Sequence, residues 1–138
     1  MHDLTKPSFA PKSSTLLIDM RLKGQTRHTF AKYDKFQVGD EASKYILKIS
    51  GPSGNATNPA SFSTYYNNRK FSTYDQDNDD YSEGDCSNQY GRVGWWFKNC
   101  FHTLLTGEYK FTSSVGEIKW FYPCRQPDFV EMKIRRNL

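Results

Sequence analysis

Hydrophobic and polar residues alternate along several segments of the chain, and this alternation predicts β-strands. In residues 15–23 the even-numbered positions are all apolar, whereas most positions between them are charged. A period of two places one set of side chains on each face of a strand, so this segment is expected to be half-buried. Residues 28–36 and 44–50 continue with β-prone and aromatic residues, and residues 130–136 alternate again. We therefore predict an antiparallel sheet in which the last segment joins the first three.

The middle of the chain lacks this regular pattern. Residues 51–61 contain two glycines and two prolines and are expected to form a surface loop that ends the first three strands. This loop carries Asn55 in an Asn-Ala-Thr sequon, a candidate N-glycosylation site. Between residues 62 and 128 glycine, asparagine, aspartate and aromatic residues dominate, and no long amphipathic helix is expected. Such a region needs another source of stability, and a disulfide or a bound metal is the usual one.

The composition is that of one globular domain. A chain of 138 residues has room for one packed core, and its aromatic content of 16% is too high for a disordered chain. The net charge of +4 is too small to indicate nucleic-acid binding, and the apolar runs are too short for membrane insertion. The N-terminal residues lack the apolar segment of a secretory signal peptide, so we expect either a cytosolic protein or a fragment of a longer chain.

A dense acidic run lies between residues 75 and 85. It contains six acids and no basic residue: Asp75, Asp77, Asp79, Asp80, Glu83 and Asp85. Alternate aspartates in a tight turn bring their oxygens together, and Ca²⁺ accepts six to eight oxygens at about 2.3–2.6 Å. The spacing is not that of an EF-hand, because Asp80 stands where glycine is needed and Cys86 where glutamate is needed. Spacing alone leaves a calcium site and a solvated acidic turn as alternatives.

Three cysteines, Cys86, Cys100 and Cys124, cannot all pair within one chain. A disulfide between the first two, 14 positions apart, would stabilise the fold by about 3 kcal/mol and imply an oxidising compartment. The alternative is a zinc site that adds Cys124 and His102, but no C-x-x-C spacing supports it.

Adjacent aromatic residues, Trp95, Trp96 and Phe97, lie between the first two cysteines. On the surface they would stack on bases or sugars, with Arg92 and Lys98 nearby. In the interior they would form a small core of their own. The second reading is favoured, because adjacent tryptophans in a short loop are more often buried.

Catalytic residues are not apparent in the sequence. The three histidines, His2, His28 and His102, match no metal-hydrolase spacing, and no G-x-S-x-G motif occurs. We therefore expect a protein that is not an enzyme.

A longer pattern extends over most of the chain. It consists of YDKFQVGDEASKYILKISG, then FSTYDQDNDDYSEGDCSNQYGRVGWWFKNC, then LLTGEY and finally VEMKIRR. Together these strings resemble the fibrinogen C-terminal (fibrinogen-related) domain family, as in ficolins, tachylectins, angiopoietins, tenascins and fibrinogen chains. The resemblance implies an α+β fold, mostly antiparallel β-sheet with a loop-rich lobe that binds calcium and ligand. It also implies a secreted, extracellular and non-enzymatic protein.

The resemblance further divides the chain. It implies a partial fibrinogen C-terminal domain over residues 1–138, with the central sheet region at 1–60 and 128–138 and the calcium and ligand lobe at 61–127. The family's N-terminal subdomain has no counterpart here, so the domain is expected to be incomplete.

The resemblance also implies a metal site and a disulfide. The disulfide joins Cys86 to Cys100 and leaves Cys124 unpaired within the domain. The implied calcium ligands are the side chains of Asp77 and Asp79 and the backbone carbonyls of Tyr81 and Gly84, with Glu83 as the alternative to Gly84.

Lectin members of the family carry a pocket for acetyl groups beside the calcium site. The corresponding ligand-binding candidates here are Tyr90, Phe101 and His102. Phe101 stands where many lectin members have histidine, and His102 follows one place later. The loop at residues 110–119 is shorter than in the family and lacks its aromatic-alanine wall. We therefore expect weak or absent binding of acetylated sugars.

Two functions from different classes follow from these observations. The first is a secreted calcium-binding recognition module that binds glycans or a protein receptor in innate immunity or extracellular adhesion, with oligomerisation through regions N-terminal to this segment. The alternative is a truncated structural domain, a remnant that binds nothing.

Overall fold

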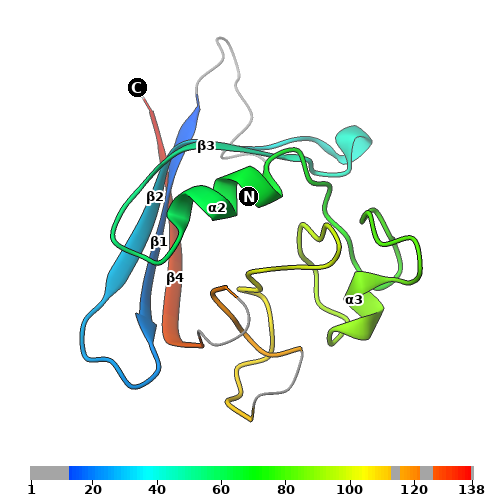
Figure 1. The fold of residues 1–138 in the computed structure, drawn as a ribbon. Helices are drawn as coiled ribbons and strands as arrows, with labels where there is room; N and C mark the ends of the chain where they lie inside the picture. Colours follow the sequence, from blue (N-terminus) through cyan, green and yellow to red (C-terminus); the bar gives the residue numbers. More distant parts are fainter. Residues whose placement is uncertain (1–12, 113–115, 122–125, 138) are drawn as a thin grey trace.

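The computed structural model describes residues 13–112, 116–121 and 126–137, and its centre is a four-stranded antiparallel sheet with the strand order β3-β2-β1-β4 (Figure 1). The elements along the chain are β1 (Ser14–Leu22), β2 (Thr29–Val38), the 3-10 turn η1 (Glu41–Ser43), β3 (Leu47–Ser53), α2 (Pro59–Tyr66), α3 (Cys86–Gln89) and β4 (Pro127–Arg136). A lobe of loops between α2 and β4 lies beside the sheet and carries the short helix α3.

Strand β1 has the faces that its alternating sequence predicts. The side chains of Leu16, Ile18 and Met20 are at most 1% exposed, whereas the residues between them are half-buried on the opposite face. On one edge β1 pairs with β2, and on the other it pairs with β4. The predicted antiparallel sheet, including the C-terminal strand, is therefore confirmed.

The strand predicted at residues 44–50 begins later, at Leu47. The backbones of Lys44 and Tyr45 are left-handed, with φ of 62° and 55°, and cannot continue a strand. They follow the η1 turn, whose preceding residue Asp40 accepts the backbone N–H of Ser43 at 3.0 Å. The apolar alternation runs through Tyr45 in the sequence, but the turn interrupts it in space.

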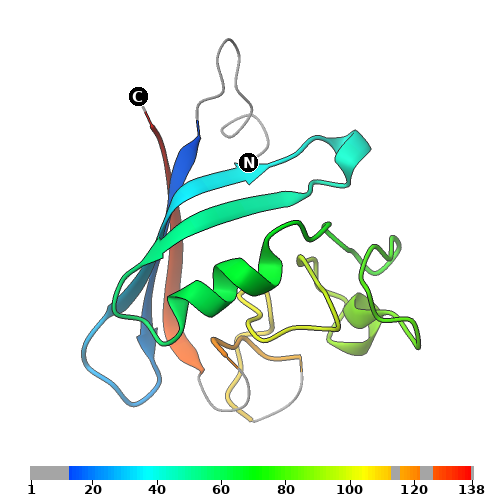
Figure 2. The same cartoon turned by 45° about the horizontal axis from the view of Figure 1, so that its top comes forward.

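The surface loop expected at residues 51–61 is largely replaced by regular structure. Strand β3 extends to Ser53, and α2 begins at Pro59. Proline suits the first position of a helix, because its missing N–H would have no helical partner there. Figure 2 shows α2 lying across the sheet, and the expected boundary between residues 60 and 61 falls inside this helix. No helix among the described residues is long and apolar enough to cross a membrane.

Phe62 of α2 lies at the centre of the core. Its ring stacks on Trp120 with centroids 5.5 Å apart, and it also contacts Tyr33 of β2 at 5.4 Å and Tyr66 at 4.9 Å. The edge of Trp95 lies 6.4 Å away. One side chain therefore joins the sheet, the helix and the lobe into a single hydrophobic core.

The adjacent tryptophans belong to this core. Trp95 and Trp96 are 1% and 4% exposed, which confirms that they are packing residues. The indole N–H of Trp96 donates to the carbonyl of Tyr45 at 2.9 Å, and that of Trp120 donates to the carbonyl of Thr57 at 2.7 Å. These bonds attach the lobe to the end of β3 nearest η1 and to the segment before α2.

Strand β4 forms one edge of the sheet among the described residues. Its register places Val130, Met132 and Ile134 on the same face as the buried side chains of β1. Met132 is nevertheless 37% exposed, because no further described strand covers this edge.

Candidate calcium site and its surroundings

Three aspartates of the acidic run converge in the lobe. Asp77, Asp79 and Asp85 each offer a carboxylate oxygen, and these oxygens all lie within 4.8 Å of one another. Asp77 is exposed, whereas Asp79 and Asp85 are half-buried. Turn bonds hold the chain around them, since the amide of Asn78 donates to the carbonyl of Phe71 at 2.8 Å. The loop therefore places three carboxylates at one point of the surface.

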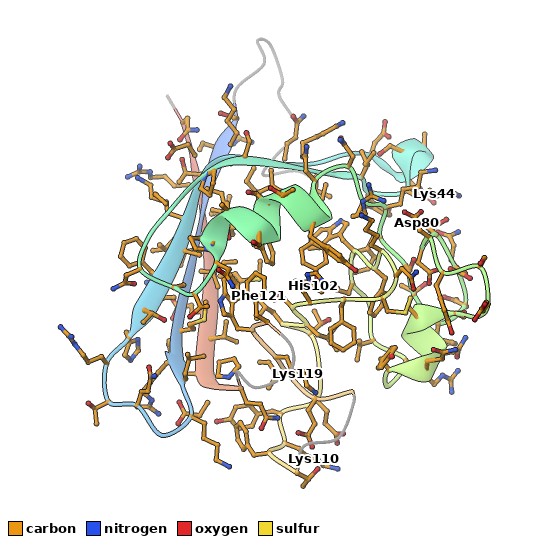
Figure 3. The ribbon with its side chains drawn as sticks, viewed as in Figure 1. Lys44, Asp80, His102, Lys110, Lys119 and Phe121 are labelled. Atoms are coloured by element: carbon orange, nitrogen blue, oxygen red, sulfur yellow. A yellow bond between two sulfur atoms is a disulfide. The ribbon has the colours of Figure 1, made fainter. Side chains whose placement is uncertain are left out.

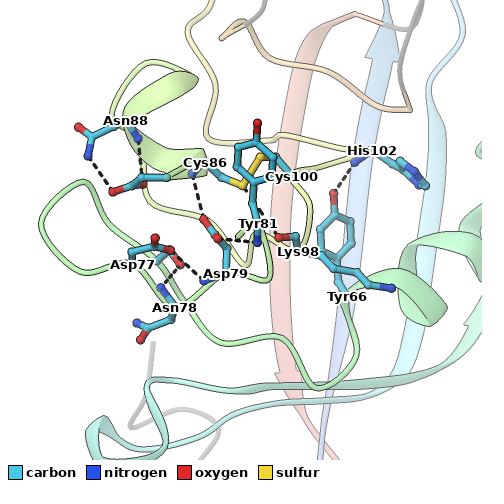
Figure 4. Close-up of a disulfide and its surroundings, with 12 residues drawn as sticks. Tyr66, Asp77, Asn78, Asp79, Tyr81, Cys86, Asn88, Lys98, Cys100 and His102 are labelled. Atoms are coloured by element: carbon cyan, nitrogen blue, oxygen red, sulfur yellow. Dashed lines mark hydrogen bonds between the residues drawn. A yellow bond between two sulfur atoms is a disulfide. The ribbon is translucent and has the colours of Figure 1, made fainter. Parts of the chain in front are cut away.

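Asp79 connects this cluster to the disulfide, as Figure 4 shows. One of its oxygens accepts the backbone N–H of Tyr81 and the other accepts that of Cys86, both at 2.9 Å. Burial raises the pKa of the Asp79 carboxyl above its usual value, the two N–H donors lower it, and Asp77 raises it further. A cation beside Asp79 would offset both the burial and the repulsion.

The other acids of the run are engaged elsewhere or lie outside the cluster. Asp80 forms an ion pair with Arg69 at 2.5 Å, and its backbone N–H donates to the carbonyl of Lys98. Asp75 accepts a hydrogen bond from the hydroxyl of Thr73 at 2.7 Å. Asp85 serves the cluster and also caps α3, because it accepts the backbone N–H of Asn88. The converging set is thus smaller than the acidic run.

The donor atoms of the cluster fit a hard cation. They are all carboxylate oxygens, which Ca²⁺ prefers, and each oxygen keeps a lone pair beside the N–H that it already accepts. The expected carbonyl ligands lie in the turn between Asp79 and Asp85, where the N–H of Gly84 donates to the carbonyl of Tyr81 at 3.4 Å. Gly84 is tightly packed, since a β-carbon there would lie 2.9 Å from the Tyr81 ring.

The disulfide joins Cys86 to Cys100, with the Cα atoms 5.5 Å apart. Because both sulfurs are bonded to each other, they are not thiolate ligands, and the zinc alternative has lost two of its four donors. Cys86 is fully buried and begins α3. Cys124 lies outside the described residues.

The three candidates for an acetyl pocket do not lie together. Tyr90 and Phe101 meet edge to face with ring centroids 4.9 Å apart. The His102 ring instead stacks on Tyr65 of α2 at 4.1 Å, and Figure 4 shows His102 and the acidic cluster on opposite sides of the disulfide. Gly116 packs against the Tyr90 backbone, while part of the expected far wall, residues 113–115, lies outside the described residues.

The sequon residue Asn55 is exposed on the connection between β3 and α2. Its side-chain oxygen accepts the backbone N–H of Phe30 at 2.9 Å. The nitrogen that would carry a glycan is the other atom of the amide, so Asn55 remains a prediction as a glycosylation site.

Two further residues of interest were missed by the sequence reasoning. Asp85 belongs to the acidic run, but it lies several positions beyond Asp77, and this spacing gives no sign that the turn at residues 81–84 returns it to the cluster. Tyr65, which stacks on His102, has no sequence feature that marks it as a site residue. Its only relevant feature is that it lies four residues after Ser61 and so shares a helix face with it.

The fold and the site together define a class of domain, in which an antiparallel sheet supports a loop-rich acidic lobe held by one disulfide. Residues 1–136 match the family described as fibrinogen beta and gamma chains, C-terminal globular domain. The chain belongs to this family, and the resemblance and the α+β fold expected from the sequence are confirmed.

Individual relatives agree with this assignment. The chain is 42% identical over 114 residues to Fibrinogen-like protein A of Apostichopus parvimensis, covering 80% of this chain and 39% of that protein. It is 38% identical over 130 residues to tenascin of Gallus gallus, covering 89% of this chain and 7% of tenascin.

Solved structures show the same fold. The fibrinogen-like globe domain of human ANGPTL2 has a TM-score of 0.77 at 30% identity and covers 91% of this chain and 59% of that chain. A lamprey fibrin D-dimer, complexed with the peptide Gly-His-Arg-Pro-amide, has a TM-score of 0.72 at 26% identity, covering 90% and 45%. The chain therefore spans less than two thirds of each of these relatives. The family is generally non-enzymatic, and fibrinogen-like proteins and tenascins are extracellular.

Proposed function

We propose that the chain is a secreted, non-enzymatic recognition module whose lobe binds Ca²⁺ and an extracellular protein partner. The observation that carries the proposal is the convergence of Asp77, Asp79 and Asp85 on a loop bonded directly to the disulfide. The disulfide suits an oxidising compartment, and the extracellular relatives support secretion.

Calcium has a physical task in this arrangement. Three carboxylates whose oxygens lie within 4.8 Å repel one another, and a divalent cation turns that repulsion into attraction. The proposed ligands are the side chains of Asp77 and Asp79 and the carbonyls of Tyr81 and Gly84, with the Asp85 carboxylate beside them. Ca²⁺ would then fix the turn at residues 81–84, which leads into α3 and the disulfide. The cation orders the lobe rather than performing chemistry.

A protein partner is supported by the surface of the lobe. Tyr74 is 48% exposed, and the guanidinium of Arg92 lies 4.1 Å above its ring. Exposed tyrosine and arginine are the residues that most often anchor protein interfaces. The lamprey fibrin relative is complexed with a peptide ligand, which supports the proposal of a protein partner for this fold.

Calcium binding gives the first prediction. Titration calorimetry is expected to detect one site, and Asp77→Asn should weaken it by at least about tenfold, because Ca²⁺ affinity follows the number of charged oxygen ligands. Asp77 is the clean position to change, since it is exposed and its carboxylate accepts the backbone N–H of Asp79 at the long distance of 3.2 Å.

The matched control is Asp75→Asn, which removes one charge from the same run but lies outside the cluster. This variant should bind Ca²⁺ within about twofold of the unchanged protein, because only a screened charge at some distance is lost. Equal losses in the two variants would show a diffuse acidic surface instead of a site. The absence of any calorimetric signal would favour the structural remnant.

Acetylated sugars give the second prediction. N-acetylglucosamine is expected to bind with a Kd of about 1 mM or weaker, equivalent to about 4 kcal/mol or less. Tyr90 keeps one apolar wall, but Phe101 offers no donor for the acetyl carbonyl, and His102 stacks on the α2 side. Saturation-transfer NMR measures this directly. A Kd well below about 1 mM, together with loss of binding in Tyr90→Ala, would contradict this prediction.

A further inference from the structure

A cleft unrelated to the acidic cluster lies between α2 and the chain that follows Cys100. Its volume is about 580 Å³, enough for one or two sugar rings. The side chains that matter here are Ser61, Thr64 and Tyr65 of α2, together with Lys98, His102 and Phe121. In Figure 3 His102 and Phe121 lie side by side below α2.

One wall of the cleft is a row of three rings. His102 stacks on Tyr65 with centroids 4.1 Å apart and an angle of 28°, and Phe121 lies 6.4 Å beyond His102. The His102 side chain is exposed, and Tyr65 and Phe121 are half-buried. These faces suit a flat ligand with an apolar surface, such as the C–H face of a pyranose ring.

The wall is fixed from behind by the core. The hydroxyl of the buried Tyr66 accepts the backbone N–H groups of His102 and Thr103, both at 2.9 Å, and donates to the carbonyl of Thr103 at 2.7 Å. The N–H of Phe121 donates to the Thr103 hydroxyl at 3.3 Å, and Phe121 has a left-handed backbone with φ of 61°. A bulky residue keeps such a conformation only where its surroundings impose it. The rings are therefore held in place before any ligand arrives.

The lining of the cleft also carries a positive charge. Lys98 is its charged side chain, and no carboxylate lines it among the described residues. The ammonium of Lys98 lies 5.2 Å from the Tyr65 ring centroid and forms no ion pair within the described part of the chain. The backbone around it is fixed, because its carbonyl accepts the N–H of Asp80 and its N–H donates to the carbonyl of Cys100. The backbone that carries this cation is therefore held in place beside the cleft.

We propose that this cleft binds an anionic saccharide, a pyranose that carries a carboxylate or a sulfate. The ring would stack on Tyr65 and His102, the anionic group would meet Lys98, and the hydroxyls would meet the exposed side chains of Ser61 and Thr64 on the same face of α2. A ligand with an apolar face, several hydroxyls and one negative charge satisfies all three parts of the lining. The site is separate from the proposed calcium site and does not depend on it.

The test is NMR titration of the whole chain, with and without a calcium chelator. One arm uses a sulfated heparin-derived disaccharide, the second a glucuronate-containing unsulfated disaccharide, and the third neutral cellobiose. The expected result is a shift of the His102 and Phe121 ring signals with at least one anionic sugar and none with cellobiose. The first two arms tell whether sulfate or carboxylate is preferred. Because the chelator removes Ca²⁺, failure of the calcium proposal would leave this result unchanged.

Variants distinguish binding in this cleft from non-specific electrostatic attraction to the surface. Lys98→Gln should weaken binding by about tenfold and His102→Ala by about fivefold, since a charge-assisted contact and a stacking face are lost. The matched control Lys35→Gln removes an exposed charge on β2 and should have less than about a twofold effect. Equal losses in the two lysine variants, equal binding of cellobiose, or no shift with either anionic sugar would overturn the proposal.

Discussion

Replacing Phe62 by alanine is expected to lower the free energy of unfolding by about 3–5 kcal/mol. Phe62 is 2% exposed, and its ring touches aromatic side chains from the sheet, from α2 and from the lobe. The cavity left behind cannot close easily, because the surrounding rings are held by hydrogen bonds such as that from the Tyr33 hydroxyl to the carbonyl of Pro59 at 2.8 Å. Urea unfolding followed by tryptophan fluorescence measures the loss.

The matched control is Phe30→Ala. Phe30 is also on the sheet, but its side chain is 39% exposed, so the expected loss is below about 1 kcal/mol. Phe62→Leu should fall between the two, at about 1–1.5 kcal/mol, because most of the buried volume is kept. A Phe62→Ala variant no less stable than Phe30→Ala would show that the lobe does not pack on the sheet in solution.

Removing the disulfide is expected to lower the free energy of unfolding by a similar amount, but the structural effect should lie in the lobe. The double variant Cys86→Ala with Cys100→Ala should lose about 3 kcal/mol, since the loop between the cysteines is no longer closed in the unfolded chain. The native lobe should also loosen, because the N–H of Cys86 holds Asp79 from this point. Calcium affinity should therefore fall along with stability.

Hydrogen exchange locates this second effect. Amides between residues 72 and 98 should exchange faster in the double variant, while those of β1 and β2 should remain protected, because sheet pairing does not involve the cysteines. The single variant Cys100→Ala also loses the disulfide but keeps the Cys86 side chain. It should therefore show the same faster exchange as the double variant. Uniform acceleration across sheet and lobe would contradict this division.

The parts of the fold predicted from the sequence are those set by local alternation. Strand β1 is one example, because its alternate apolar residues Leu16, Ile18, Met20 and Leu22 are buried and the strand has a paired neighbour on both sides. Strand β3 starts later than the sequence predicts, because the left-handed turn residues Lys44 and Tyr45 include no glycine to mark the turn. Helix α2 is not predicted, because Pro59 in a segment with two glycines and two prolines favours a loop, although proline is also common at the first helical position.

The sequence predicts only those parts of the site that depend on residues close to one another in the chain. Asp77 and Asp79 lie two residues apart in one turn, so their proximity follows from the sequence. The ion pair of Asp80 with Arg69 does not follow from the sequence, because Arg69 lies eleven residues earlier and only the fold places it beside Asp80. The separation of Phe101 from His102 was equally invisible, since it depends on the buried hydroxyl of Tyr66, which holds the His102 backbone against α2.

The pairing of β1 with β4 has a consequence for biosynthesis. The two strands are joined from Ser14 opposite Arg136 to Leu22 opposite Pro127, so the neighbours in space are separated by almost the whole described chain. The hairpin of β1 and β2 can form as soon as it is made, whereas β4 leaves the ribosome only after the entire lobe. Closing so long a loop is slow, because its entropy must be lost before the strand contacts are gained. Until then β1 lacks its β4 partner among the described strands, and an unpaired strand edge of this kind can pair with another molecule.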